Sequence, residues 1–195
     1  MSERPNILWY CTDQQRFDTI GALGNPHVRT PVVDQLVRDG VAFTHTYCQS
    51  PICTPSRASI ITGQYPHVNG VTDLTGRVLP AKQTLPILFR KAGYQTAMIG
   101  KWHLKVEPNF DYYKVLPGQG KYFNTEFRVQ GDKPWPKNVV IHKGEHSSDA
   151  ITDSTLHWFK TQYDKDKPFF ICHQFKAPHD YFCLLYTSPS PRDRG

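Results

Sequence analysis

The sequence predicts an α/β domain with a mostly parallel central sheet and helices on its faces. The main observation is a helix-then-strand pattern that occurs three times, because parallel strands need a helical crossover between them. A length of 195 residues is enough to bury one sizeable core. A composition of 38% hydrophobic and 21% charged residues is that of an ordinary globular protein.

The chain opens with an expected strand, followed by the first helix-strand unit. Residues 5–11 (PNILWYC) are an apolar run that ends at polar TDQQ, as a buried strand does where its carboxyl end meets a loop. In residues 30–43 (TPVVDQLVRDGVAF), apolar residues recur at helical spacing and Gly40 ends the helix. A short apolar strand is expected after this glycine.

The pattern then returns twice. Residues 83–104 (QTLPILFRKAGYQTAMIGKWHL) predict a helix up to Lys91 and the strand QTAMIG. Residues 147–175 predict a helix up to Lys160 and the strand KPFFICHQF. Between these units, residues 106–146 show little periodicity, so we expect a long surface excursion of the kind that often shapes substrate access.

Charge, hydropathy and cysteine spacing argue against several classes of protein. The net charge is +6, but the basic residues are scattered among acids, so no nucleic-acid partner is expected. No apolar run approaches the ~20 residues of a membrane span, and MSERPNILWYC lacks the apolar core of a secretion signal. A cytoplasmic protein is therefore expected, with a periplasmic or extracellular location as the alternative. The five cysteines form no CxxC pair, which argues against a disulfide framework or a zinc ribbon.

One cysteine lies at the expected start of a helix, in SPICTPSRASIITGQYPH. Cys53 or Thr54 takes the N-cap position, Pro55 lies in the first turn, and the helix runs to Gly63. Backbone N–H groups at that end favour an anion, and Arg57 adds a positive charge about one turn on. The stretch therefore predicts a site for a thiolate or an oxyanion. The simpler interpretation is a buried cysteine before a proline-initiated helix.

The run CTPSR, which begins at Cys53, resembles the C-x-P-S-R motif of the type I, formylglycine-dependent sulfatases of the alkaline phosphatase superfamily. PNILWYCTDQQ, TPSRASIITGQYPHVNGV, GKWHL and FKAPHD also resemble sulfatase blocks, in the same order. The resemblance implies an alkaline-phosphatase-like fold, with residues 1–182 as the N-terminal part of the catalytic domain and a sheet that is incomplete at the C-terminus. Residues 183–195 (CLLYTSPSPRDRG) resemble translated sequencing-adapter read-through and are expected to be a non-native tail, with a native Ser/Pro tail as the alternative.

The resemblance implies hydrolysis of sulfate monoesters. In the family, the cysteine of the motif, here Cys53, is oxidised to formylglycine by a formylglycine-generating enzyme. One hydroxyl of the hydrated aldehyde attacks sulfur and expels the alcohol, and the other then loses its proton, so that the C–O bond breaks and sulfate leaves. A sulfate ester is an anion with a poor leaving group, so the chemistry also needs cations around the sulfuryl oxygens and a proton donor for the leaving oxygen.

Asp13 and Gln14 are oxygen donors at the carboxyl end of the first expected strand, where open α/β sheets place ligands. The resemblance implies that they bind a divalent metal together with the modified Cys53. Oxygen-only ligation indicates Ca²⁺, with Mg²⁺ or Mn²⁺ as alternatives. Sulfatases often carry two adjacent acids here, and Gln14 departs from that pattern because an amide oxygen brings less charge. Without the resemblance, Asp13 is equally a helix cap or a turn residue.

Lys101 and His103 lie two apart at the end of an expected strand, so their side chains can point to the same side. The resemblance implies that Lys101 contacts the sulfate and that His103 takes the proton from the second hydroxyl. It also implies that Arg57 lies beside the nucleophile and His179 near the leaving-group oxygen. The other histidines are expected to be surface or core residues.

Several interpretations stay open from the sequence. A phosphonate or phosphate ester hydrolase of the same superfamily shares the nucleophile, and the substrate is either a sulfated small molecule or a glycan. A thiol phosphatase would need a C-x5-R loop, but Ser59 stands six residues after Cys53. A non-catalytic binding module is the third class. The family's other metal ligands and its second sulfate-binding lysine lie in its C-terminal half, so these 195 residues alone are expected to be inactive and poorly folded.

Overall fold

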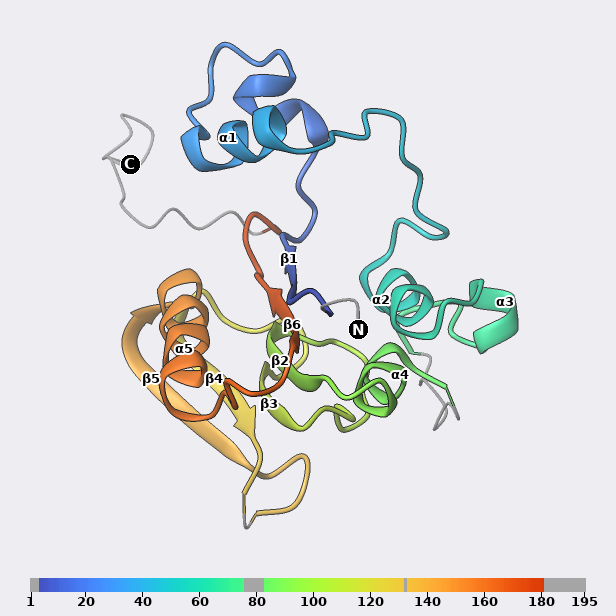
Figure 1. Ribbon diagram of the computed structural model, residues 1–195, viewed down its shortest axis with the longest axis vertical. Coiled ribbons are helices and arrows are strands. Elements are labelled where there is room, and N and C mark those ends of the chain that lie inside the picture. The colour runs from blue at the N-terminus through green and yellow to red at the C-terminus, as the bar shows by residue number, and fades with distance from the viewer. Residues whose placement is uncertain (1–3, 76–82, 132, 181–195) are drawn as a thin grey trace, which may run out of the picture.

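The computed structural model describes residues 4–75, 83–131 and 133–180, and within them one six-stranded sheet forms the centre (Figure 1). The strand order is β1-β6-β2-β3-β4-β5. Neighbours among the first four strands of this order pair in parallel, and the last two pairings are antiparallel. The prediction of an α/β fold with a mostly parallel sheet is confirmed. The strands are β1 (Ile7–Cys11), β2 (Gln95–Lys101), β3 (Tyr112–Leu116), β4 (Phe123–Val129), β5 (Val139–His146) and β6 (Phe169–Gln174).

Helices cover both faces of the sheet (Figure 1). The helices α2 (Cys53–Thr62), α3 (Pro66–Asn69) and α4 (Leu85–Lys91) lie on one side, and α5 (Ser147–Thr161) lies on the other. The helix α1 (Pro31–Asp39), with the short 3-10 helices η1 (Phe17–Thr19) and η2 (Gly21–Leu23), forms a lobe beyond the carboxyl end of β1. No helix in these three described stretches is long and apolar enough to cross a bilayer.

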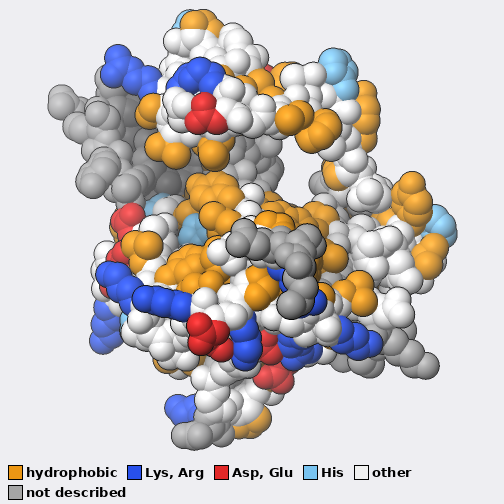
Figure 2. All heavy atoms as spheres, viewed as in Figure 1, with side chains coloured by type: hydrophobic (Ala, Val, Ile, Leu, Met, Phe, Trp, Pro, Cys, Tyr) orange, Lys and Arg blue, Asp and Glu red, His pale blue; other side chains and the backbone are white. Residues whose placement is uncertain are grey.

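The burial of β2 explains why this strand could be predicted from its apolar residues. Met98 packs in the core under α2 and α4, whereas Ala97 and Ile99 pack in the core under α5. Because both faces of the strand are buried, both sets of alternate positions are apolar and the segment appears as a continuous apolar run. The edge strand β1 differs, since Leu8 and Tyr10 are 54% and 53% exposed. Apolar side chains accordingly gather at the centre of the face in Figure 2.

Two expectations about secondary structure were wrong. Residues 106–146 are not one surface excursion, because they contain β3, β4 and β5. Two of these strands are not buried on both faces: β4 buries only alternate residues such as Thr125 and Phe127, and β5 is mostly exposed. The strand expected after Gly40 is absent, and Val41 and Phe43 are 80% and 81% exposed without a partner strand.

Gly100 lies in β2 opposite Gln174, the last residue of β6. Its φ is +102°, and an added Cβ would lie 1.8 Å from the Gln174 carbonyl oxygen. We expect Gly100→Ala to lower the free energy of unfolding of the full-length protein by about 3 kcal/mol or more, since left-handed strain and overpacking add. Gly24→Ala is the matched control, because Gly24 has φ +105° but open space around it. Denaturant unfolding should give about 1–2 kcal/mol for the control, and equal losses would contradict the close contact.

Candidate active site

The carboxyl end of β1 and the start of α2 meet at the site. Asp13 follows β1, is 7% exposed, and donates its backbone N–H to the Ala177 carbonyl at 3.1 Å. The N-cap of α2 is Ile52, with φ −120° and ψ 136°, so Cys53 is the first helical residue. The expectation that Cys53 or Thr54 is the N-cap was wrong by one residue. Thr54 instead donates its hydroxyl to the His103 carbonyl at 3.2 Å, which ties α2 to the end of β2.

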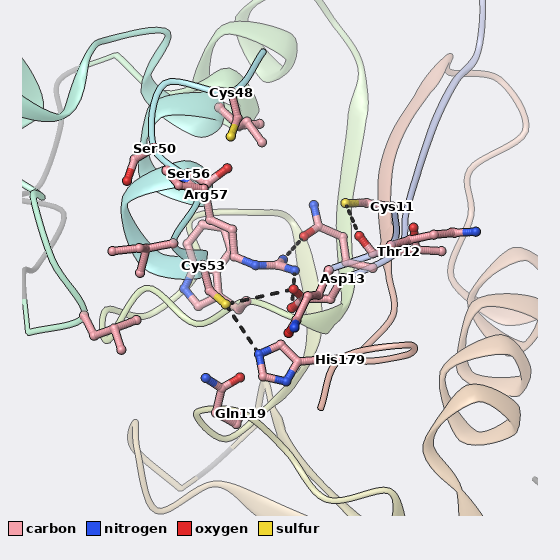
Figure 3. A pocket seen from close by; sticks show the side chains of 18 of the residues that line it. Cys11, Thr12, Asp13, Cys48, Ser50, Cys53, Ser56, Arg57, Gln119 and His179 are labelled. Carbon is pink, nitrogen blue, oxygen red and sulfur yellow. Dashed lines mark hydrogen bonds and ion pairs between the residues drawn. The ribbon is translucent and has the colours of Figure 1, made fainter. Parts of the chain in front are cut away.

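Cys53 Sγ is the centre of a cluster of polar atoms (Figure 3). It lies 3.9 Å from Asp13 Oδ1, 3.7 Å from His179 Nε2 and 3.8 Å from Lys101 Nζ. These partners come from the carboxyl ends of β1 and β2 and from the segment after β6. Parallel topology explains the arrangement, because the carboxyl ends of parallel strands share one edge of the sheet.

Two cations hold the Asp13 carboxylate. Lys101 is fully buried and its Nζ forms an ion pair with Asp13 Oδ2, which also receives Arg57 Nη2 at 3.1 Å. Burial alone would raise the pKa of Asp13, but Arg57, Lys101 and His179 outweigh it and hold that pKa below its usual value. Asp13 is therefore ionised at neutral pH. Two cations around one carboxylate leave a positive excess next to Cys53, which suits an anionic substrate.

Arg57 has partners at the carboxyl ends of three strands. Its Nη1 donates to the Lys101 carbonyl at 2.5 Å and to Gln174 Oε1 at the end of β6. With the bond to Asp13, the guanidinium connects the ends of β1, β2 and β6. The guanidinium N–H groups of Arg57 thus donate to groups of the protein itself, and Arg57 orients the strand ends around Cys53.

Gln14 and His103 lie near the cluster without a described contact to Cys53. Gln14 has φ 61° and is an exposed residue of the cavity wall beside Asp13. His103 follows the end of β2 with φ 57°, so the strand alternation that predicted its direction stops at Lys101. Its Nδ1 is buried without a hydrogen-bond partner among the described residues. Burial, Lys101 and Arg57 lower the pKa of His103 to about 4, so its imidazole is neutral at pH 7.

Two glutamines of the site escaped the sequence analysis. Gln174, the acceptor for Arg57, ends the apolar strand β6, and the rule that selected Asp13 at a strand end would have selected it too. Gln119 accepts from Lys101 Nζ at 2.5 Å and lies in the segment interpreted as a surface excursion, where no local signal marks it.

A cavity of about 730 Å³ opens beside these residues. Asp13, Gln14, Cys53, Arg57 and His179 are among its lining residues. Its wall also includes apolar side chains and two further thiols, contributed by Ile52, Ile60, Leu74, Trp102, Cys11 and Cys48. This volume falls in the range of small-molecule sites, which is roughly 300–1,000 Å³.

A family model described as sulfatase matches residues 5–193. The chain belongs to the sulfatase family. The resemblance recognised in the sequence motifs is thereby confirmed. The match includes residues 183–193, which lie outside the described residues, and the domain limit at residue 182 with its non-native tail stays a prediction.

Relatives of this sulfatase chain include proteins that are themselves named as sulfatases. The N-acetylglucosamine-6-O-sulfatase of Bacteroides thetaiotaomicron is 36% identical over 198 residues, covering 100% of this chain and 33% of that protein. An ulvan-active sulfatase of Formosa agariphila is 33% identical over 188 residues, covering 90% of this chain and 36% of that protein.

The fold comparison agrees with this assignment. A solved structure in complex with its substrate D-glucosamine-2-N,6-O-disulfate matches with a TM-score of 0.84 and 37% identity, over 91% of this chain and 35% of that chain. The chain therefore spans about a third of the length of these relatives.

Proposed function

We propose that the protein to which these residues belong hydrolyses sulfate monoesters, with Cys53 converted to formylglycine as the nucleophile. The observation that carries this proposal is the position of Cys53, at the N-terminus of α2 with Lys101, Asp13 and His179 around its sulfur. Membership of the sulfatase family supports it. Formylglycine, when present, supplies two hydroxyls on one carbon after hydration, which neither serine nor cysteine offers.

A divalent metal fits the carboxylate end of the site. The donor atoms of Asp13, Cys53 and His179 lie within 4.8 Å of one another. Asp13 Oδ2 is held by Lys101 and Arg57, whereas Oδ1 faces Cys53. We infer that Asp13, the Gln14 amide oxygen and the modified Cys53 hold Ca²⁺, with Mg²⁺ or Mn²⁺ as alternatives. When bound, the metal lowers the pKa of a hydroxyl and supplies a nucleophile at neutral pH.

Three side chains carry out the other steps of the proposed reaction. Lys101, whose ammonium lies 3.8 Å from Cys53 Sγ, holds the sulfuryl oxygens beside the nucleophile. His103, neutral because of its lowered pKa, accepts the proton whose loss releases sulfate. His179 presents Nε2 to the nucleophile because its Nδ1 contacts Asp180 Oδ1 at 2.6 Å, and it serves the leaving-group oxygen.

Names of the relatives support a sulfated sugar as the substrate. They include an N-acetylglucosamine-6-O-sulfatase, an ulvan-active sulfatase and a complex with a glucosamine disulfate. We extend this to the present protein as a sulfated sugar or glycan, with a small aryl sulfate as the alternative. A phosphonate or phosphate ester hydrolase is the competing function, and the relative turnover of aryl sulfate and aryl phosphonate esters by the full-length protein decides between them.

Conversion of Cys53 is the direct test of the nucleophile. After co-expression with a formylglycine-generating enzyme, the tryptic peptide Asp39–Arg57 is expected to be lighter by the change from CH₂SH to CHO. Fragment ions should place this change at Cys53 and leave Cys48, in the same peptide, as an unmodified internal control. If Cys53 stays a thiol under conditions that convert a known sulfatase, the formylglycine proposal is wrong.

A further inference from the structure

The connection between β3 and β4, residues 117–122, touches two of the proposed catalytic residues. Gln119 Oε1 accepts a hydrogen bond from Lys101 Nζ at 2.5 Å. The Tyr122 hydroxyl donates to the His179 carbonyl at 2.5 Å. We propose that Gln119 and Tyr122 are positioning residues for sulfate ester hydrolysis, the first acting through Lys101 and the second through His179. This inference rests on the function proposed above.

Gln119 completes the surroundings of a fully buried ammonium. Lys101 has three N–H donors and no acceptor, and its partners are Asp13 Oδ2, Gln119 Oε1 and Cys53 Sγ. Because Asp13 and Gln119 each hold one N–H, the third is directed at the sulfur of Cys53. Without the Gln119 oxygen, the fully buried ammonium loses one of its two oxygen acceptors, which is costly for a buried charge, and we expect it to turn toward Asp13.

The chemistry of the Lys101 ammonium also fixes which end of the Gln119 amide faces it. An ammonium only donates, so Oε1 must point to Lys101, and Nε2 remains as a donor. Gln119 belongs to the cavity wall, and in Figure 3 its amide points into the pocket. Gln119 therefore offers its NH₂ group to an oxygen of a bound substrate.

Tyr122 contacts the segment that carries His179 at two places. The Lys176 ammonium lies 4.6 Å from the centroid of the Tyr122 ring, and the Tyr122 hydroxyl reaches the His179 carbonyl. The ring also makes a stacked contact with His146, with the ring centroids 5.4 Å apart. A turn joins the two points, since His179 donates its N–H to the Lys176 carbonyl at 3.0 Å. The position of His179 Nε2 beside Cys53 thus depends on Tyr122.

The two residues should affect different parts of the reaction. Lys101 acts on the sulfuryl oxygens, which every sulfate ester has, so loss of Gln119 should slow all substrates. His179 acts on the leaving oxygen. A sugar alkoxide needs a proton to leave, whereas para-nitrophenolate leaves without one. Loss of Tyr122 should therefore slow a sugar sulfate far more than para-nitrophenyl sulfate.

The experiment compares kcat and KM of the full-length protein for glucosamine 6-O-sulfate and para-nitrophenyl sulfate. Gln119→Met is expected to lower kcat about tenfold to a hundredfold for both esters, the usual cost of losing a supporting contact to a catalytic group. Tyr122→Phe keeps the ring beneath Lys176 and is expected to lower kcat about tenfold for the sugar sulfate only. Peptide mass and thermal unfolding, measured for every variant, separate these effects from loss of Cys53 conversion or of folding.

Two control variants match these substitutions. Lys121→Gln changes the same loop at an exposed side chain that pairs with Glu126. Tyr65→Phe removes the hydroxyl of an exposed tyrosine. Both should stay within about twofold of the unchanged protein. A protein with normal Cys53 conversion that hydrolyses neither ester overturns the proposed function and this inference with it. If it is active and Gln119→Met and Tyr122→Phe match the controls, the inference alone is overturned, and an equal loss on both esters in Tyr122→Phe overturns the role of Tyr122.

Discussion

Cys53→Ala in the full-length protein is expected to lower kcat/KM for para-nitrophenyl sulfate by a factor on the order of 10⁴ or more. On the proposed mechanism, no nucleophile can be formed without the Cys53 side chain, while Lys101 and His179 would still bind and orient the ester. KM is therefore expected to change much less than kcat. Steady-state kinetics with a sensitive phenolate assay measure both quantities.

Cys48→Ala is the matched control for this experiment. Cys48 lines the same cavity and lies five residues before Cys53, but it is exposed and has no described hydrogen bond. Its variant should keep nearly full activity. If Cys53→Ala retained a tenth of the original activity, the nucleophile would have to be another group.

Asp13→Ala is expected to reduce both stability and activity. Its carboxylate forms ion pairs with two cations, and Lys101 is fully buried. Removing one member of a buried ion pair leaves uncompensated charge and costs about 3–5 kcal/mol of unfolding free energy. Because Asp13 is also the proposed metal ligand, Ca²⁺ should no longer raise the melting temperature of this variant. Denaturant unfolding and thermal scans with and without Ca²⁺ measure the two effects.

Asp18→Ala provides the comparison for Asp13→Ala. Asp18 pairs with Arg16, and both side chains are largely exposed, so solvent already screens the charges. No measurable change in stability or in the response to Ca²⁺ is expected. An Asp13→Ala protein that is as stable as the Asp18→Ala protein would show that the two cations do not need the carboxylate.

The parts of the fold that sequence reasoning found are those with a local signal. The strands β2 and β6 are buried on both faces and appear as apolar runs, and α2 ends at Gly63 in a left-handed conformation that glycine adopts readily. The strands β4 and β5 carry no such signal, because β4 buries only alternate residues and β5 is mostly exposed. Val41 and Phe43 show the reverse case, in which apolar residues had the pattern of a strand but found no partner.

The candidate site divides in the same way. Asp13 and Lys101 were predictable because Asp13 follows one strand and Lys101 ends another, and parallel strands bring such ends together. The packing around Lys101 was not predictable, because Gln119 reaches it only after β3 has paired with β2. Similarly, Tyr122 meets His179 across a separation of 57 residues that no local pattern encodes.

The tight contact at Gly100 links backbone packing with chemistry. The Gln174 carbonyl fills the space that a side chain would need, the Gln174 amide receives Arg57, and Lys101 follows directly in the chain. A side chain at position 100 would displace Gln174, which binds Arg57, and would also disturb the backbone next to Lys101. Position 100 therefore offers no route to tune selectivity or heat tolerance separately. Engineering of the protein should start instead at cavity-wall residues such as Ile52 and Leu74, which are 42% and 45% exposed and for which the structure shows no ion pair or side-chain hydrogen bond among its described residues.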